Sequence, residues 1–255
     1  MLNRRGLPLL LATPALAQLQ PLTVLGTGAT ETPIEQVAHA FTRATGRAVV
    51  TATGNGGQVA RRIRGGETPD VVLNAAGSLD ALIGDGFVIA ASRREMGRMR
   101  LGVAVRAGAP EPEISTEAGL AMFLRGVASI GISDAATGAT SGTHVLALLE
   151  RLAVPPEAAG GPRRAPFARG IGAVRAVALG EITCVITQIS EILAVTEVRL
   201  VAPLPEPLQL VTPYVAAVAA RASDPTAAAA FIDMAAGPVG QDLFRAVGFD
   251  VGRRR

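Results

Sequence analysis

The sequence predicts an α/β fold in which short strands alternate with helices along the chain. Three features favour this fold class: runs of β-branched residues recur, apolar residues at helical spacing follow each run, and glycine stands at most junctions. No repeat, low-complexity block or disordered linker interrupts the alternation. The pattern alone leaves open whether the elements form one doubly wound unit or two smaller ones.

The first half of the chain has distinct element boundaries. Thr32, Pro33 and Glu35 form a capping-box pattern, which predicts that Thr32 caps a helix ended by Gly46. The buried stripe of this helix is predicted to be Ile34, Val37, Ala38 and Phe41. The other elements predicted here are strands at 22–25, 48–51, 71–73 and 101–105 and helices at 59–63 and 79–83.

The second half continues the same alternation. Ser115 is predicted to cap a helix, with Glu117 in its first turn, where the helix dipole favours a negative charge. Asp224 and Pro225 mark another helix start. The elements predicted are strands at 129–132, 182–186, 198–201 and 214–218 and helices at 115–124, 143–152, 171–179, 225–234 and 238–248.

The N-terminus has the pattern of an export signal. Arg4 and Arg5 precede an apolar run that is too short to span a bilayer, and the run ends in a small-x-small sequence. This predicts a signal peptide at 1–17, cleaved after Ala17, and a periplasmic protein exported by the Sec or the twin-arginine route. A buried N-terminal helix is the alternative, but two prolines in the run disfavour it.

Composition argues against several classes of function. Loss of the two signal-peptide arginines lowers the formal net charge from +3 to +1, and the chain has no lysine, no tryptophan and one tyrosine. A nucleic-acid partner is therefore not expected, and no later segment is apolar enough for stable membrane insertion. Cys184 is the only cysteine and is predicted to be a core thiol. His39 and His144 are far apart, so no metal and no cofactor are predicted.

Three glycine-rich segments lie between a predicted strand and a predicted helix, at 26–30, 53–58 and 137–143. Each would place free backbone N–H groups at a helix start, where anions bind. Ordinary turn chemistry is the alternative. Gln188 and Ser190 follow a predicted strand and could donate hydrogen bonds to the same ligand, although Ser190 could equally be a helix cap.

The known nucleotide and hydrolase motifs do not fit. The segment 26–31 begins like a dinucleotide fingerprint but has Glu31 in place of its third glycine, and a P-loop requires a lysine. Ser141 is not flanked as a nucleophile elbow. His144 lies three residues from Ser141, yet no carboxylate is evidently placed to orient it.

Several segments resemble a known family, the type II periplasmic solute-binding proteins, in the branch around the molybdate-binding proteins. The segments similar to its first lobe are 22–25, the helix to Gly46, 60–63 and 65–73. Others resemble a subgroup that includes aconitate-isomerase-like proteins, and these are 105–110, 114–116, 133–142, 188–192 and 201–205.

The resemblance implies two Rossmann-like lobes joined by two crossover segments, with a ligand in the cleft between them. Lobe I would comprise 18–104 and 210–255, and lobe II 105–209. Carried over position by position, the ligand-binding residues would be Gly28, Ala29, Thr30, Asn55, Gly56, Gly57, Thr140, Ser141, Gly142, Thr187 and Gln188.

Departures from the family pattern disfavour molybdate as the ligand. The molybdate binders use serines in the first two loops and a tyrosine in the last, where this chain has Ala29, Gly56, Gly57 and Thr187. Each lost donor would weaken oxyanion binding by about 1 kcal/mol. An organic acid fits better. Arg61 or Arg62 could bind its carboxylate, although both could simply be solvated helix residues.

The expected function is capture of a small anion for an inner-membrane ABC permease. The alternative is an aconitate-isomerase-like enzyme, which moves a proton and a double bond in a tricarboxylate. That reaction requires a base within reach of the carbon acid. In a chain without lysine, the candidates are His144, Glu191 and Asp134.

Overall fold

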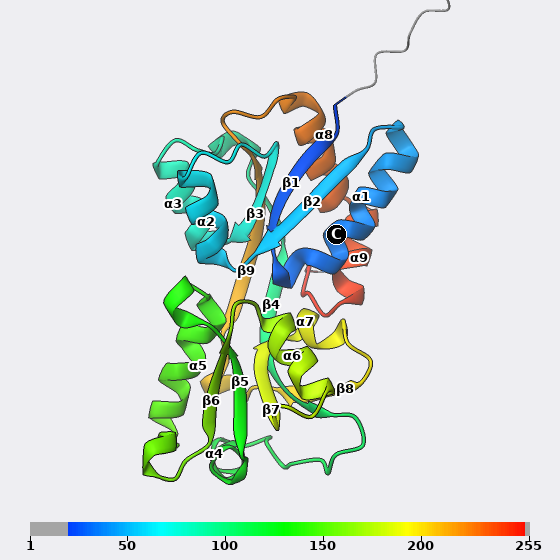
Figure 1. Cartoon of the computed structure of the whole chain (residues 1–255). Coiled ribbons are helices and arrows are strands. Elements are labelled where there is room, and N and C mark those ends of the chain that lie inside the picture. Colours follow the sequence, from blue (N-terminus) through cyan, green and yellow to red (C-terminus); the bar gives the residue numbers. More distant parts are fainter. Residues whose placement is uncertain (1–19, 253–255) are drawn as a thin grey trace, which may run out of the picture.

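A computed structural model describes residues 20–252, so the predicted signal peptide lies outside the described residues. Two α/β lobes lie end to end (Figure 1). The strand β4 (Arg94–Arg106) runs from one lobe into the other, and residues 204–210, between β8 and β9, cross back. The α/β class and the two-lobed architecture predicted above are confirmed.

Lobe I has a sheet in the order β2-β1-β3-β9-β4. The first three strands are parallel, β9 is antiparallel to β3, and the first half of β4 is antiparallel to β9. Its strands are β1 (Leu22–Thr27), β2 (Val49–Gly54), β3 (Val71–Ala75) and β9 (Val211–Val218). Its helices are α1 (Glu31–Thr45), α2 (Gly56–Arg64), α3 (Ala76–Gly84), α8 (Pro225–Ala236) and α9 (Pro238–Ala246).

Lobe II is built on the second half of β4. This half pairs antiparallel with β7 on one side and with β8 on the other, and β5 and β6 extend the sheet in parallel beyond β7. Its other strands are β5 (Ser129–Ser133), β6 (Arg163–Phe167), β7 (Cys184–Gln188) and β8 (Val198–Pro203). Its helices are α4 (Glu117–Gly126), α5 (Thr140–Arg151), α6 (Gly170–Ala178) and α7 (Ile189–Leu193).

The strand β4 changes its partner where it leaves lobe I. Arg94 to Arg100 pair with β9, and Leu101 to Val105 pair with β7. A single strand shared by two sheets holds the lobes together while leaving few chain crossings between them. The lobe limits at 104 and 210 stay predictions, and the pairing places the first crossing at Arg100–Leu101.

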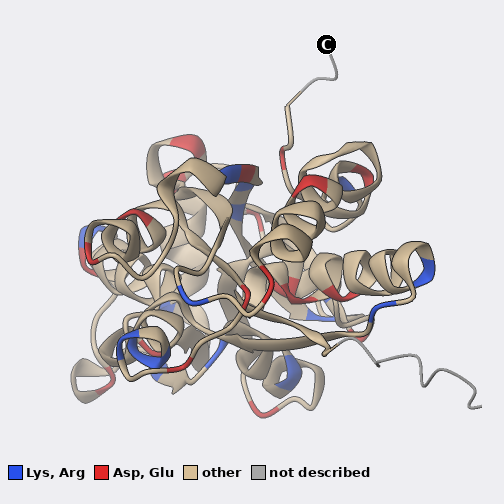
Figure 2. Ribbon diagram, turned by 90° about the horizontal axis from the view of Figure 1, so that it is seen from above, with Lys and Arg blue, Asp and Glu red and all other residues tan. Residues whose placement is uncertain are grey.

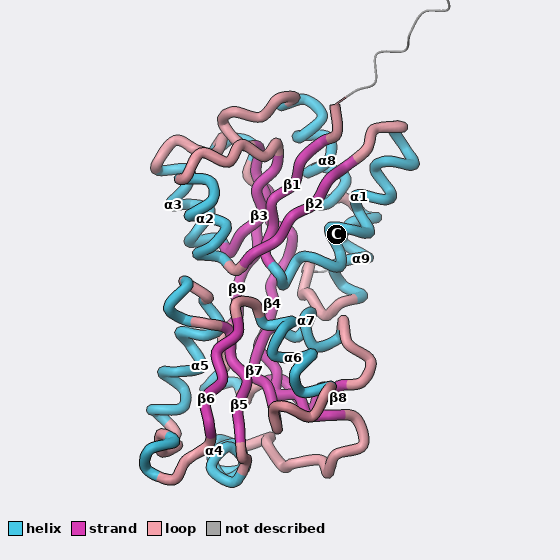
Figure 3. The backbone as a smooth tube through the Cα atoms, viewed as in Figure 1, coloured by secondary structure: helices cyan, strands magenta, loops and turns pink. Residues whose placement is uncertain are grey.

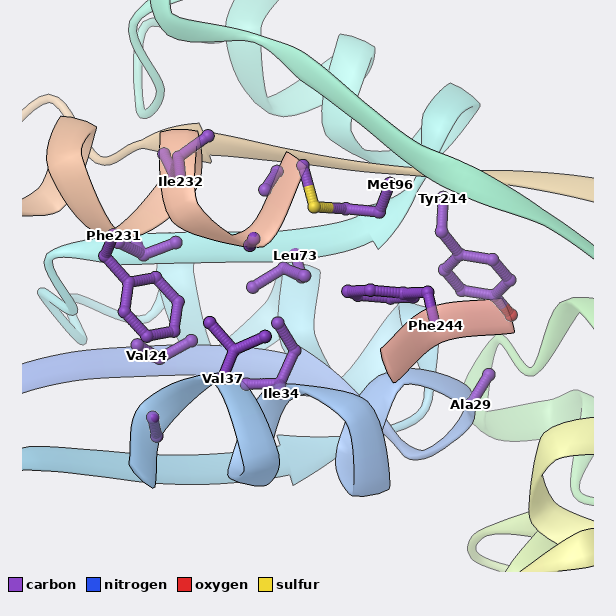
Figure 4. Close-up of a cluster of buried hydrophobic side chains, with 14 of the residues drawn as sticks. Val24, Ala29, Ile34, Val37, Leu73, Met96, Tyr214, Phe231, Ile232 and Phe244 are labelled. Carbon is purple, nitrogen blue, oxygen red and sulfur yellow. The ribbon is translucent and has the colours of Figure 1, made fainter. Parts of the chain in front are cut away.

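Helices cover both faces of the lobe I sheet (Figure 3). On one face, α1, α8 and α9 pack against the strands through a large apolar cluster, part of which is shown in Figure 4. The predicted stripe of α1 is buried there, and Phe41 meets Phe231 edge to face at 5.5 Å. Each fully buried side chain of this size stabilises the fold by about 1.5–3 kcal/mol.

Two helix caps predicted from the sequence are wrong. Helix α1 begins at Glu31, so Thr32 lies inside its first turn and caps nothing, because a short turn at Gly28–Thr30 already leads the chain into the helix. Helix α4 is capped by Thr116 rather than by Ser115, since the Thr116 side chain accepts a hydrogen bond from Gly119 N at 3.0 Å.

Two strands differ from the sequence prediction, one in length and one in its existence. Strand β4 begins at Arg94 rather than 101, because its charged residues point outward while Met96 and Met99 are buried. Strand β6 was not predicted at all. It lies at the edge of its sheet, where Pro166 costs no central ladder hydrogen bond and the arginines remain in contact with solvent.

Charge is dispersed over the part of the chain that the structure describes. Seen from above, acidic and basic positions are scattered among several helices and loops (Figure 2). Between residues 20 and 252, no helix is long and apolar enough to cross a membrane, and no group of three His, Cys, Asp or Glu side chains is placed to hold a metal ion.

Candidate functional site

A cavity lies where the two lobes meet. Its wall combines the carboxyl ends of β1, β2, β3, β5 and β7 with the starts of the helices that follow, as expected for open α/β sheets. The lining residues are Thr27, Gly28, Ala29, Gly54, Asn55, Gly56, Asn74, Ala75, Ser133, Ala139, Thr140, Ser141, Arg169, Gly170, Gln188, Glu191 and Tyr214.

Four helices of nine residues or more, α2, α3, α5 and α6, begin at this cavity, as do the short turn at Gly28–Thr30 and helix α7. The first N–H groups of a helix have no partner within it, and the helix dipole makes this end positive. Helix starts from both lobes therefore surround one small space. This arrangement favours a negatively charged ligand.

Asn55 organises the start of α2. Its side-chain oxygen accepts from Gln58 N at 2.9 Å, and the Gln58 side chain accepts from Asn55 N at 2.9 Å, which completes a capping box. The Asn55 amide also donates across the cleft to Thr137 Oγ1 at 2.5 Å and to Ala168 O at 3.1 Å. One residue thus both caps a helix and joins the two lobes.

The lobes touch on both sides of the cavity. Gly57 N donates to Gly138 O at 3.1 Å, and Ser190 Oγ donates to Ala29 O at 2.8 Å. A Cβ atom on Gly57 would lie only 2.4 Å from Thr137 O, so the approach of the backbones requires glycine there. The space is partly open and about 30 Å³, enough for about two water molecules. A larger ligand can enter only when the lobes open, before they close on it.

Arg169 is the only cation among the lining residues, and it precedes α6 in lobe II. Its Nη1 donates to both carboxylate oxygens of Glu31 at 3.2 Å and to Thr53 Oγ1 at 2.6 Å, all in lobe I. The Nε and Nη2 groups of Arg169 form no hydrogen bond within the described chain. Arg169 therefore links the lobes and retains donors for an anion.

Glu191 is the only carboxylate side chain in the wall, and only 6% of its surface is exposed. Its Oε2 accepts from Thr187 Oγ1 at 2.7 Å and its Oε1 from Ile171 N at 3.2 Å. Burial raises the pKa of Glu191, and these hydrogen bonds and the Arg169 charge only partly counter the rise. The carboxyl group is therefore neutral over a wider pH range than an exposed glutamate.

Two further polar side chains face the cavity. The Tyr214 ring packs against Phe249 edge to face at 5.7 Å, at the same end of the apolar cluster as Ala29 (Figure 4). Burial raises the pKa of Tyr214, as does the Glu191 charge, so its hydroxyl stays protonated. Gln188 is 4% exposed, and its side-chain oxygen has no hydrogen-bond partner in the described structure. Its amide is free to meet a ligand.

The structure brings seven of the eleven predicted ligand-binding residues into the cavity wall: Gly28, Ala29, Asn55, Gly56, Thr140, Ser141 and Gln188. The other four are placed just behind it. Thr30 Oγ1 donates to Thr27 O, Gly57 contacts the opposite lobe, Gly142 packs under Ser133, and Thr187 supports Glu191. Contact of all eleven residues with a ligand stays a prediction.

The three candidate bases have different surroundings. Glu191 lies in the wall, whereas His144 Nε2 is 2.8 Å from Leu208 O and Asp134 caps a turn by accepting from Ala136 N at 2.9 Å. Neither His144 nor Asp134 lines the cavity. Arg61 and Arg62 do not line it either, and Arg62 is paired with Glu67.

Sequence reasoning missed Arg169 and Tyr214. Arg169 follows the unpredicted edge strand β6, so nothing marked it as the end of a strand, although Gly170 directly after it hinted at a helix start. Tyr214 is the only tyrosine of the chain, but within a strand it is indistinguishable from a core residue.

Comparison with known proteins establishes the class. Residues 22–250 match the family described as bacterial extracellular solute-binding protein, and the chain belongs to this family. Among curated proteins, it is 34% identical over 236 residues to an aconitate isomerase of Pseudomonas sp., which covers 89% of this chain and 87% of that protein.

Solved structures share the fold. The periplasmic molybdate-binding protein of Azotobacter vinelandii superposes with a TM-score of 0.73 at 22% identity, covering 91% of this chain and 100% of that chain. A tungstate ABC transporter structure from Geobacter sulfurreducens gives 0.66 at 19% identity, covering 89% and 98%. The family match confirms the resemblance to solute-binding proteins, and these structures confirm that the fold is that of the type II periplasmic binding proteins.

Proposed function

We propose that this protein captures a small organic anion with two or three carboxylates between its lobes, and delivers it in the periplasm to an inner-membrane ABC permease. One observation carries the proposal: helix starts from both lobes and the Arg169 side chain line a single cavity. Backbone N–H groups and a guanidinium fork are the donors that carboxylates prefer.

The wall suits an organic acid better than a bare oxyanion. A tetrahedral oxyanion only accepts hydrogen bonds, whereas the hydroxyl group of an acid such as malate or citrate can also donate one to the unpartnered Gln188 oxygen. Ala29 and Gly56 contribute no side-chain hydroxyl. Burial favours the neutral form of Glu191, and a neutral carboxyl group can donate a hydrogen bond to an anionic oxygen of the ligand.

Calorimetric titration of the mature protein tests this proposal. We expect citrate, the aconitates or malate to bind, with molybdate and sulfate much weaker. In a thermal melt, a ligand at 100 times its dissociation constant adds about 2.7 kcal/mol to the free energy of unfolding. Binding of molybdate alone would contradict the proposal. Uptake of the labelled acid by cells lacking the protein tests the transport role, because a purely enzymatic role leaves uptake unchanged.

A second candidate function is isomerisation of aconitate. Two observations favour it: a buried carboxyl group, Glu191, lies in the wall of a cavity otherwise built for anions, and the curated relative is an aconitate isomerase. Proton NMR of cis- or trans-aconitate with the protein tests it through the vinyl signals.

A further inference from the structure

The cavity wall contains three ionisable side chains among the described residues: Arg169, Glu191 and Tyr214. An arginine does not give up its proton at physiological pH. Tyr214 also keeps its proton, because burial raises its pKa. Glu191 is thus the one side chain in the wall able to take a proton from a bound ligand and return it.

Two glycines make room for the Glu191 carboxyl group. A Cβ atom on Gly28 would lie 2.7 Å from Glu191 Oε1, and one on Gly170 would lie 2.1 Å from Oε2. Gly28 belongs to lobe I and Gly170 to lobe II, so the carboxyl group lies between the starts of helical segments from both lobes. No larger side chain fits at either position without moving the carboxyl group.

The carboxyl group is oriented but not saturated with hydrogen bonds. Thr187 Oγ1 donates to one of its oxygens and Ile171 N to the other. Because a carboxylate has about four lone-pair sites, each oxygen retains capacity for a further partner. A group held in one orientation with free lone pairs is arranged for proton transfer.

The charges facing Glu191 suit this role. Burial raises its pKa, Arg169 on the start of α6 lowers it, Glu31 on α1 raises it, and Tyr214 on β9 faces it as a neutral hydroxyl. A bound tricarboxylate adds negative charge and raises the pKa of Glu191 further. A pKa above that of an exposed glutamate brings the group towards the pH at which acid–base catalysis is most efficient.

We propose that Glu191 is the catalytic acid–base that transfers a proton between two carbons of an unsaturated tricarboxylate held in this cavity. The inference rests on the proposed binding of such anions. The Glu191 carboxylate removes a proton from the methylene carbon. The C–H electron pair forms the new double bond, the electrons of the old one move to its far carbon, and that carbon receives the proton from neutral Glu191. The formula of the ligand is unchanged and no oxidant is required.

The remaining wall supplies charge stabilisation. Loss of the proton places negative charge on the carbon framework, from which it spreads into the adjoining carboxylates. Those carboxylates would be held by helix-start N–H groups and by the free donors of Arg169. Donors fixed before the reaction stabilise such charge without reorganising.

The test uses the mature protein with cis-aconitate in D₂O, followed by proton NMR and by calorimetric binding. We expect the wild type to exchange deuterium into the ligand and to interconvert its isomers. Glu191→Gln is expected to slow both by about 10²–10⁴-fold while binding cis-aconitate within about tenfold of the wild type. Glu35→Gln, an exposed carboxyl-to-amide change on α1, is the matched control and should leave both rates unchanged.

Each outcome bears on a different proposal. If the wild type binds no carboxylate, the proposed function fails and the inference falls with it. If the wild type binds cis-aconitate but neither exchanges nor isomerises it, the inference alone fails. Retention of the wild-type rate by Glu191→Gln also overturns it.

The pH profile separates chemistry from mere structural support. The rate should rise as pH passes upward through the pKa of Glu191, because the base form is needed. Thr187→Val removes a hydrogen bond that stabilises the carboxylate, so it should move this rise to higher pH. An unchanged midpoint in Thr187→Val, with the protein folded, would contradict proton transfer by Glu191.

Discussion

Two buried carboxyl groups, Asp70 and Glu191, are 2% and 6% exposed and yet differ in every other respect. Asp70 stands just before β3, and four groups donate to it at 2.7–2.8 Å: the backbone N–H and hydroxyl of Thr23 and those of Ser223. Glu191 receives only two hydrogen bonds from the protein. The two carboxyl groups have similarly small exposed fractions, but Glu191 lies deeper in the protein and has fewer donors.

Their pKa values move in opposite directions. Burial alone would raise the pKa of Asp70, but the hydrogen bonds from Thr23 and Ser223 together lower it. Burial dominates at Glu191 and raises its pKa. A buried carboxyl group with its full set of donors is thus a charged structural link, whereas one with spare lone pairs remains available for proton exchange.

Their positions explain the difference. Asp70 precedes a parallel strand, at the sheet end away from the cavity, where it ties β1, β3 and the approach to α8 together. Glu191 follows β7, at the carboxyl end of its strand. Open α/β sheets bind ligands at the carboxyl ends of their strands, so one end of the sheet is free for structural links while the other carries the site.

The largest effect should come from Asp70→Ala. The change removes four hydrogen bonds to a buried, charged carboxylate, so it should lower the free energy of unfolding at pH 7 by about 3–4 kcal/mol. Urea unfolding measures it, with the exposed Asp80→Ala as control, for which we expect less than about 1 kcal/mol. Equal losses in the two variants would refute the structural role of Asp70.

Arg169→Met tests whether the cavity that contains Glu191 binds anions. The substitution removes the only cation from the wall, and should weaken binding of a tricarboxylate by about 10–100-fold, or about 1.4–2.8 kcal/mol. Arg175→Met is the matched control, because Arg175 lies on the exposed face of α6, the helix that Arg169 precedes. This variant should bind as the wild type. Calorimetric titration measures the affinity of both variants. Equal affinities would show that Arg169 does not contribute to ligand binding.

Gly57→Ala tests whether closure belongs to binding. The added methyl group would clash with Thr137 O in the closed form, so we expect about a tenfold loss of affinity, or about 1.4 kcal/mol. Gly77→Ala, in α3 with nothing within 4 Å of the added atom, should leave affinity unchanged. If Gly57→Ala binds like Gly77→Ala, the contact between the lobes at this point does not accompany binding.

The smallest expected effect is on the pH dependence of the free energy of unfolding. Glu191 has a raised pKa in the folded protein, so its contribution to stability is fully present below its ordinary pKa of 4.5 and is lost as pH rises through the folded value. Asp70 behaves in the opposite way, and its contribution is lost as pH falls below its ordinary value of 3.8. Unfolding of Glu191→Gln between pH 4 and 8 should show a flatter decline than the wild type as pH rises above 4.5, and identical curves would contradict the raised pKa.

Local patterns predicted much of the fold. The apolar stripe of α1, its end at Gly46 and the cap of α8 by Asp224 are all visible in the sequence, because each depends on residues within a few positions of one another. The same reasoning missed β6, whose arginines and Pro166 look unlike a strand until its place at the sheet edge is known.

The sequence by itself determined three loops that line the cavity: the glycine-rich segments 26–30, 53–58 and 137–143 all contribute to its wall. Only the tertiary structure decided that they meet, that Arg169 joins them, and that Glu191 is buried with two donors while Asp70 has four. The physical reason is the separation in sequence of the groups that interact. Helix starts and turns are set by neighbouring residues, whereas the pKa of a carboxyl group and the closure of two lobes depend on groups that are distant in the sequence and are brought together by folding.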